Sequence, residues 1–296
     1  MKKTLILVAA AALAISVLAA CGKGDDSKSA GGNKHAGHTA GSAQASAHHG
    51  GDHNEHDGHG AEAASATADF QVSFAFPAGA AKADEDTELT VQVKDKSGKP
   101  VDRYEVSHEK LLHLIVVNHD LSFFNHIHPT FRGDGTFAVN TSFPAGGEYK
   151  LFADFVPAGG ANTTLSDWVQ VAGPEGAHAA ITADKTLVKE VDGKEVELIM
   201  STTKPKEDVT LTFNIRDANT KRGIDNLQPY LGAIGHVVIV SEDASQYLHV
   251  HPVDEKATGP DAAFATSFPD SGTYKIWGQF QHDGKVFTAP FVVNMK

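Results

Sequence analysis

Two histidine clusters in this sequence share one spacing. In each, a histidine is followed thirteen residues later by a second and, two residues after that, by a third that precedes proline. The clusters are His113, His126 and His128, and His236, His249 and His251. Neutral imidazole is the commonest protein ligand for metal ions such as Zn²⁺ and Cu²⁺, so each cluster is a candidate metal site. The alternative is that each histidine is a half-buried sheet residue or part of a solvent-exposed face.

The spacing suits two neighbouring strands. His126 and His128 are two residues apart, so on a strand their side chains leave the same face. A hairpin that reverses around residues 119–121 places one of them opposite His113. Cross-strand Cβ atoms lie about 4.5 to 5.5 Å apart, which lets three imidazoles converge on one ion at roughly 2.0 Å. The second cluster repeats this construction, with a reversal near residues 243–244.

The sequence is duplicated around these clusters. Leu89–Asp95 returns as Leu211–Asp217, 122 positions later, and the blocks that follow return 123 to 125 positions later. Offsets that drift by a few residues are what loop insertions between strands produce. The repetition therefore predicts two homologous domains with a boundary near residues 173–176.

A carboxylate accompanies only the first cluster. Asp154 aligns with Gln279 of the second copy, and each alternates with large apolar residues along its strand. Asp154 is therefore a candidate fourth ligand in the first domain, and the alternative is an ordinary exposed strand residue. Four further histidines lack the repeated pattern and are left outside the predicted site: His108, His119, His178 and His282.

Short runs with period-two alternation, bounded by Gly, Pro, Asn and Asp, begin at Asp69. Seven such runs in about a hundred residues, with no convincing amphipathic helix, indicate an all-β fold of the immunoglobulin-like antiparallel sandwich type. We expect two tandem sandwiches, at residues 68–173 and 180–296. The predicted strands of the first copy are Gln71–Phe76, Glu88–Lys94, Leu111–Asn118, Phe123–His128, Thr136–Phe143, Tyr149–Phe155 and Asp167–Val171.

The N-terminal segment has the layout of an export signal. Lys2 and Lys3 precede an apolar run that is short for a membrane span, and the chain's only cysteine, Cys21, follows it. The segment resembles a bacterial lipoprotein signal whose cysteine receives lipid. We predict a signal peptide over residues 1–20, lipidation of Cys21 and an extracytoplasmic protein anchored to a membrane. With its one thiol used in this way, the chain has none left for a disulfide or a thiolate metal site.

Residues 21–67 are rich in Gly, Ala, Ser, His and Asp and contain almost nothing large and apolar to bury, which predicts a disordered linker. Seven of the 17 histidines of the chain fall in it. The segment is typical of a loose metal-collecting tether, and the alternative is a polar spacer that happens to contain histidine.

The net charge of −12, with no cluster of Lys and Arg, excludes nucleic acid as a partner. The expected partners are a membrane, through the lipid on Cys21, a metal ion, and a membrane or exported protein that receives the metal. No nucleophile elbow, phosphate loop or HExxH helix is present, so no catalysis is expected. A three-histidine zinc ion with an open position could nevertheless activate water.

Several segments carry a family resemblance. Those of the first copy resemble the YtkA-like group of exported bacterial proteins, and those of the second copy resemble a relative of the same group. The resemblance covers most of residues 70–296. The resemblance implies small β-sandwich domains associated with copper handling outside the membrane. Its segments are Glu105–Val117, His126–Pro129 and Gly147–Phe155, then Tyr230–His236 and Tyr247–Pro252.

Imidazole ligands without nearby sulfur favour Cu²⁺ or Zn²⁺ over Cu⁺, and the general affinity order places Cu²⁺ first. We predict a copper(II)-binding carrier or scavenger, with zinc as the alternative metal. Binding should fade as the pH falls through about 6.5, where imidazole ordinarily takes up a proton. The competing hypotheses are an interaction or adhesion module with structural histidines, a zinc-binding accessory lipoprotein, and a metallohydrolase.

Overall fold

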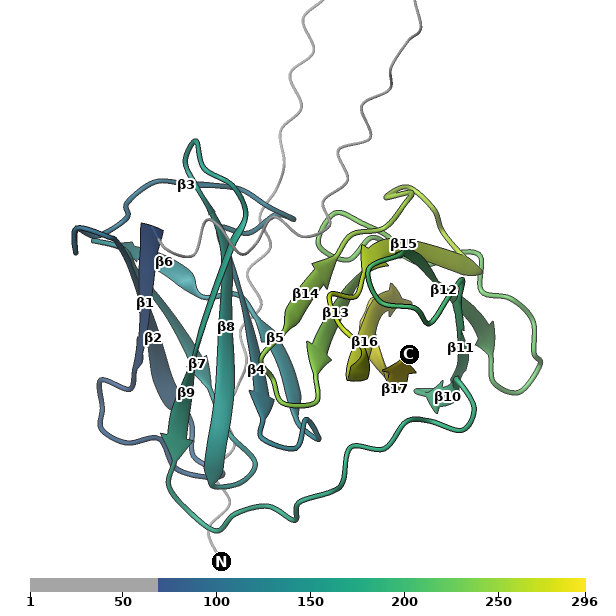
Figure 1. The fold of residues 1–296 in the computed structure, drawn as a ribbon, viewed down its shortest axis with the longest axis horizontal. Coiled ribbons are helices and arrows are strands. Elements are labelled where there is room, and N and C mark those ends of the chain that lie inside the picture. Colours follow the sequence, from purple (N-terminus) through teal and green to yellow (C-terminus); the bar gives the residue numbers. More distant parts are fainter. Residues whose placement is uncertain (1–68) are drawn as a thin grey trace, which may run out of the picture. The chain divides into compact units, whose positions relative to one another are not determined.

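The computed structural model describes residues 69–296, all of which belong to one compact unit. The predicted signal peptide, Cys21 and the histidine-rich linker lie outside the described residues. Residues 69–296 form two consecutive domains of antiparallel strands and contain no α-helix (Figure 1). Within this range, no helix with the length and apolarity needed to cross a bilayer is found.

The first domain is a two-sheet sandwich. One sheet has the strand order β1-β2-β7-β6, and the other has the order β3-β8-β4-β5, with β9 also paired to β8. Its strands are β1 (Phe70–Ala75), β2 (Thr87–Asp95), β3 (Tyr104–Glu105), β4 (Leu112–Asn118), β5 (Phe124–Ile127), β6 (Thr130–Gly133), β7 (Thr136–Thr141), β8 (Gly147–Pro157) and β9 (Thr163–Val171).

The second domain repeats the sandwich, with sheets ordered β10-β11-β12-β15 and β14-β13-β16-β17. Its colours run from green to yellow in Figure 1. Its strands are β10 (Val188–Val191), β11 (Lys194–Met200), β12 (Asp208–Asp217), β13 (Gly235–Ser241), β14 (Tyr247–Val250), β15 (Asp261–Ser267), β16 (Gly272–His282) and β17 (Lys285–Met295).

Alternation along the strands builds each core. On β2, Leu89, Val91 and Val93 are fully buried, while the residues between them are only partly covered. This period-two pattern turns one face of the sheet toward the other sheet of the same domain. The predicted fold class, two tandem immunoglobulin-like sandwiches, is confirmed. Two short strands were not predicted: β3 has only two residues, and the pairing of β6 is interrupted by a bulge.

The hairpins that carry the histidines reverse where the sequence predicts. Asp120 accepts a backbone hydrogen bond from Ser122 at 3.0 Å, and Asp243 accepts the same bond from Ser245 at 3.0 Å. Short polar side chains that bind the backbone two residues on are a common means of closing a turn. The two copies therefore present their histidines on hairpins closed in the same way.

Strands β4 and β13 are buried on both faces. All seven residues of β13 are buried, and in β4 only the last residue is partly exposed. The inner face of each strand contacts its own sandwich core, and the outer face contributes to a third core shared by the two domains. That shared core consists of Ile115, Val117, Leu121, Phe152, Val238, Val240, Ala244 and Trp277. The domains therefore pack sheet face against sheet face.

The contacts in this interface are reciprocal. The ring of Phe124 stacks on that of Trp277, with centroids 4.6 Å apart, and the ring of Phe152 stacks on that of Tyr247 at 4.8 Å. Phe124 corresponds to Tyr247, and Phe152 corresponds to Trp277, in the duplicated sequence. Each copy therefore offers the other the same surface, as in an isologous contact.

Candidate metal centre

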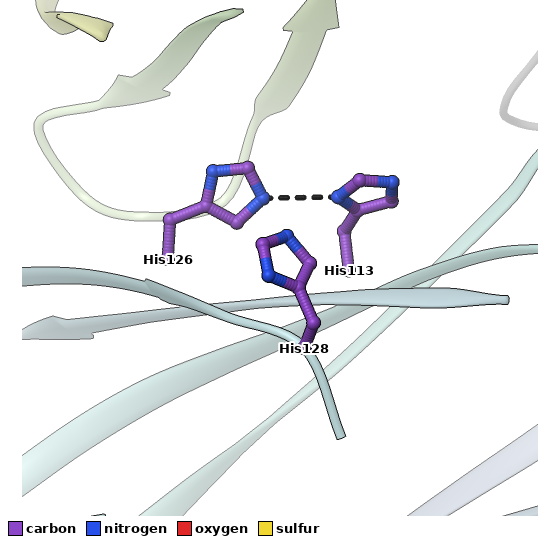
Figure 2. Close-up of side chains that lie close together, drawn as sticks. All are labelled: His113, His126 and His128. Atoms are coloured by element: carbon purple, nitrogen blue, oxygen red, sulfur yellow. Dashed lines mark hydrogen bonds between the residues drawn. The ribbon is translucent and has the colours of Figure 1, made fainter. Parts of the chain in front are cut away.

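The first histidine cluster lies on the outer face of the β4–β5 hairpin. His113 is on β4, His126 is on β5, and His128 follows the end of β5. Because Leu114 pairs with Ile127, one further step of this register places His128 opposite His113. One ring nitrogen from each histidine lies within 4.8 Å of the other two, and the rings turn toward one another in Figure 2. The structure thus brings the three residues together as the spacing predicts.

With the Gln279 amide oriented as in the structure, hydrogen bonds place the protons on two of these rings. His113 Nε2 donates to the Ser107 carbonyl at 3.0 Å, and His126 Nδ1 donates to Gln279 Oε1 at 2.7 Å. The Gln279 amide donates in turn to Thr288 Oγ1 at 3.3 Å. A neutral imidazole has only one N–H. The remaining nitrogens, His113 Nδ1 and His126 Nε2, therefore face each other at 3.0 Å with lone pairs (dashed line in Figure 2).

Burial keeps these rings neutral. It lowers the pKa of His113 and of His126 to about 4, and in His113 the neighbouring His126 ring adds to the effect. Burial likewise lowers the pKa of His128 to about 3, and its Nε2 is buried without a hydrogen-bond partner. At neutral pH no proton is available to lie between the facing nitrogens. A metal cation accepts lone pairs from all three rings, so the donor set fits Cu²⁺ or Zn²⁺.

Among the described residues, only the first cluster brings three ligand nitrogens within 4.8 Å of one another, so the predicted second triad is not assembled, and two of its histidines form a close pair. His236 on β13 and His249 on β14 place Nδ1 and Nε2 at 3.2 Å, and the His236 side chain is buried with no partner at Nε2. The His249 Nδ1–H donates to Asp154 Oδ2 at 2.7 Å. His251 follows β14, and its ring centroid is 5.2 Å from that of His249. Burial lowers the pKa of both His236 and His249.

Asp154 and Gln279 hold corresponding positions with crossed partners. Asp154 on β8 pairs in register with His113, yet its carboxylate accepts the hydrogen bond of His249 from the second domain. Gln279 on β16 pairs with His236 and accepts from His126 of the first domain. The alternative that Asp154 is an exposed strand residue is wrong, because only 2% of it is exposed. Burial raises the pKa of this carboxyl group.

His108 belongs to the cluster although the sequence pattern left it out. It lies in a turn closed by hydrogen bonds between Ser107 and Lys110, with a left-handed φ of 46°. Its ring centroid is 4.8 Å from that of His236. The ring also stacks on that of His251, with centroids 4.3 Å apart. Only the meeting of the two domains brings His108 there, so no spacing within one copy could reveal it.

The remaining described histidines make other contacts. The ring of His119 lies 6.1 Å from that of Trp168 and 6.0 Å from that of His178. His282 contacts the Asn226 side chain at 3.2 Å. Their exclusion from the predicted site agrees with these positions.

A family model for a domain of unknown function, DUF8832, matches residues 65–173 and 189–296. These two ranges confirm the predicted duplication, whereas the YtkA-like resemblance and the lipoprotein signal stay predictions. None of the curated proteins compared with the chain matches it.

Several solved structures match the chain at low identity and low TM-score. They include the adhesin FdeC of Escherichia coli (18% identity, TM-score 0.25, 77% of this chain and 64% of that one) and the bacterial integrin-binding protein invasin (14%, 0.24, 76% and 39%). A pair of fibronectin type III domains from chicken tenascin also matches (13%, 0.21, 76% and 97%). The chain spans less than two thirds of the length of the first two. At such TM-scores the likeness carries no argument about function.

Proposed function

This chain belongs to the DUF8832 family, with two tandem copies of the domain, and we propose that it binds a copper(II) or zinc ion through His113, His126 and His128. The observation that carries the proposal is the 3.0 Å approach of His113 Nδ1 to His126 Nε2, with the other nitrogen of each ring already donating a hydrogen bond. Two lone pairs repel at this distance. A cation between the rings turns that repulsion into coordination.

The three imidazole donors also indicate which metal is bound and whether it can be exchanged. All three donors are imidazole nitrogens, and for such sites the general affinity order places Cu²⁺ above Zn²⁺. Three protein ligands leave a coordination position open, as in sites that exchange a ligand, whereas closed structural sites use four. We therefore propose a carrier or scavenger. The lipid on Cys21 would anchor it outside the cytoplasmic membrane, and the linker histidines would collect metal for it.

Structural histidines are the competing interpretation, and they have a definite chemical form. If the Gln279 amide were rotated by half a turn, its N–H would donate to His126 Nδ1. His126 Nε2–H could then donate to His113 Nδ1, and the pair would need no ion. Nitrogen-15 NMR of the imidazoles in metal-free protein separates the two arrangements, because they place the His126 proton on different nitrogens.

The direct test is competitive Cu²⁺ and Zn²⁺ titration of the full chain with its seven linker histidines replaced by asparagine. We expect the number of tightly bound ions to fall by one when His113, His126 and His128 are changed together to alanine. His282→Ala is the matched control, because it removes a histidine outside the cluster. An unchanged number of bound ions in the triple variant, with a native near-ultraviolet circular dichroism spectrum, would overturn the proposal.

A further inference from the structure

Each domain supplies a hydrogen-bond acceptor to a histidine of the other. Gln279 Oε1 of the second domain accepts a hydrogen bond from His126 Nδ1, with 2.7 Å between oxygen and nitrogen. Asp154 Oδ2 of the first domain accepts one from His249 Nδ1 at the same distance. Both acceptors are buried, with 6% and 2% of their surface exposed. In metal sites, an acceptor behind the imidazole sets the orientation and basicity of the ring that binds the ion.

The two histidine pairs lie side by side. The ring centroid of His113 is 5.2 Å from that of His249 and 6.1 Å from that of His236. The ring of His126 lies 6.0 and 6.1 Å from the same two rings. These separations across the domain boundary are close to those within each pair, 5.3 and 5.5 Å. The two clusters therefore occupy one continuous, buried region.

The apolar part of the interface holds this region together. The shared core next to the histidines contains residues of β4, β8, β13 and β16, and the aromatic stacks lie on the strands that carry the histidines or their acceptors. Lys275 of the second domain also donates to the Leu121 carbonyl of the first at 2.7 Å. The hydrogen bonds that Gln279 and Asp154 accept thus lie beside a packed surface that fixes their geometry.

We propose that the two histidine clusters form one composite metal centre, in which Gln279 and Asp154 are positioning residues that each act on the opposite domain. The proposal rests on metal binding by the first cluster, as put forward above. The second position uses His236 Nδ1 and His249 Nε2 as ligands. The ring centroid of His108 of the first domain lies 4.8 Å from that of His236, and that of His251 lies 5.2 Å from that of His249. Neither copy alone contains the complete arrangement.

The two positions are chemically unequal. A carboxylate acceptor raises the basicity of an imidazole ligand more than an amide does, because it stabilises the positive charge that the ring gains when it donates to a metal. His249 is supported by the Asp154 carboxylate, and His126 by the Gln279 amide. The carboxylate-supported ligand of the second pair, His249, therefore contributes more to the metal affinity than the amide-supported His126 does.

The test changes the acceptor in one domain and measures metal at the other. In the full chain with its linker histidines replaced, Gln279→Ala should weaken Cu²⁺ binding at the first cluster by about 10- to 100-fold. Gln279→Glu should strengthen it, a gain that a merely structural residue would not give. Gln281→Ala, two residues along β16, is the matched control.

The reciprocal test uses the variant in which His113, His126 and His128 are alanine, so that only the second position remains. Asp154→Asn keeps an acceptor oxygen but removes the charge, and it should weaken the remaining Cu²⁺ binding about tenfold. If the unmodified protein binds no metal, the proposed function fails. If it binds metal and the substitutions at Gln279 and Asp154 leave both affinities unchanged, the composite centre alone is overturned.

Discussion

At the scale of single residues, burial keeps the histidines of the first cluster uncharged. An isolated imidazole takes up its proton near pH 6.5, and on that basis the sequence predicts loss of metal at that pH. Burial lowers the pKa of His113 and His126 to about 4 and that of His128 to about 3. The structure therefore replaces the pH range expected from the sequence with a lower one.

The first prediction follows from these pKa values. Cu²⁺ affinity of the first cluster should change little between pH 7 and pH 5, and should fall steeply as the pH approaches 4, because the protons then compete for the ligand nitrogens. Equilibrium dialysis at fixed ionic strength measures it. A decline that begins at pH 6.5 would mean that the rings are solvated in the folded protein.

The second prediction concerns the stability of the metal-free protein. Between pH 6.5 and about pH 4 the unfolded chain binds protons at these histidines and the folded protein does not, so the free energy of unfolding should fall as the pH falls through this window. Each pKa unit corresponds to about 1.4 kcal/mol per group. Urea denaturation at pH 7, 5.5 and 4.5 provides the measurement. Replacing His113, His126 and His128 with asparagine should flatten the dependence.

At the scale of strands, two core positions differ in side-chain size between the copies, one larger and the other smaller in the second copy. Gly278 on β16 corresponds to Ala153 on β8, and Phe213 on β12 corresponds to Val91 on β2. A Cβ added at Gly278 would lie 2.7 Å from Cε1 of Phe213. The larger ring of the second copy thus requires glycine opposite it, whereas the smaller valine of the first copy leaves room for alanine.

The third prediction tests this exchange. Gly278→Ala should destabilise the protein by about 1–3 kcal/mol through overpacking. The combination with Phe213→Val, which reproduces the pair found in the first copy, should cost less than the sum of the two single changes. Urea denaturation of the four proteins in the cycle gives the coupling. Strict additivity would show that the two positions do not share the space.

The strands themselves were largely predictable, because period-two alternation is a local signal. The histidine face of the first copy was predictable for the same reason, since His126 and His128 are two residues apart. The domain interface was not predicted, although a signal for it exists. The runs after His113 and His236 are apolar without alternation, which is typical of strands buried on both faces. The roles of His108 and Gln279 depend on that interface, and spacing within one copy carries no information about it.

At the scale of the whole molecule, the interface is the part on which the candidate site depends. Trp277 contributes to the shared core and stacks on Phe124. Phe74 on β1 provides a contrast, because it is partly buried against the core of the first domain and not against the shared core. Substitutions at Trp277 and Phe74 therefore separate an effect on the interface from a general loss of aromatic surface.

The fourth prediction is that Trp277→Ala will lower the free energy of unfolding by about 3–5 kcal/mol and will weaken Cu²⁺ binding at the first cluster. The affinity should fall because the loosened interface no longer holds Gln279 against His126. Phe74→Ala should leave the affinity unchanged. Isothermal titration of both variants decides the matter, and equal affinities for the two would show that the first cluster works independently of the second domain.

The fusion of the two copies in one chain has a consequence of its own. In a dimer of identical subunits, any substitution appears on both sides of the symmetry axis. Here the reciprocal contacts are kept, yet one side carries a carboxylate and the other an amide. Duplication within a chain thus frees a symmetric surface to diverge, and the linkage keeps the two halves at high effective concentration. If both positions bind metal as proposed, the tighter position can retain its ion while the other position hands its ion over.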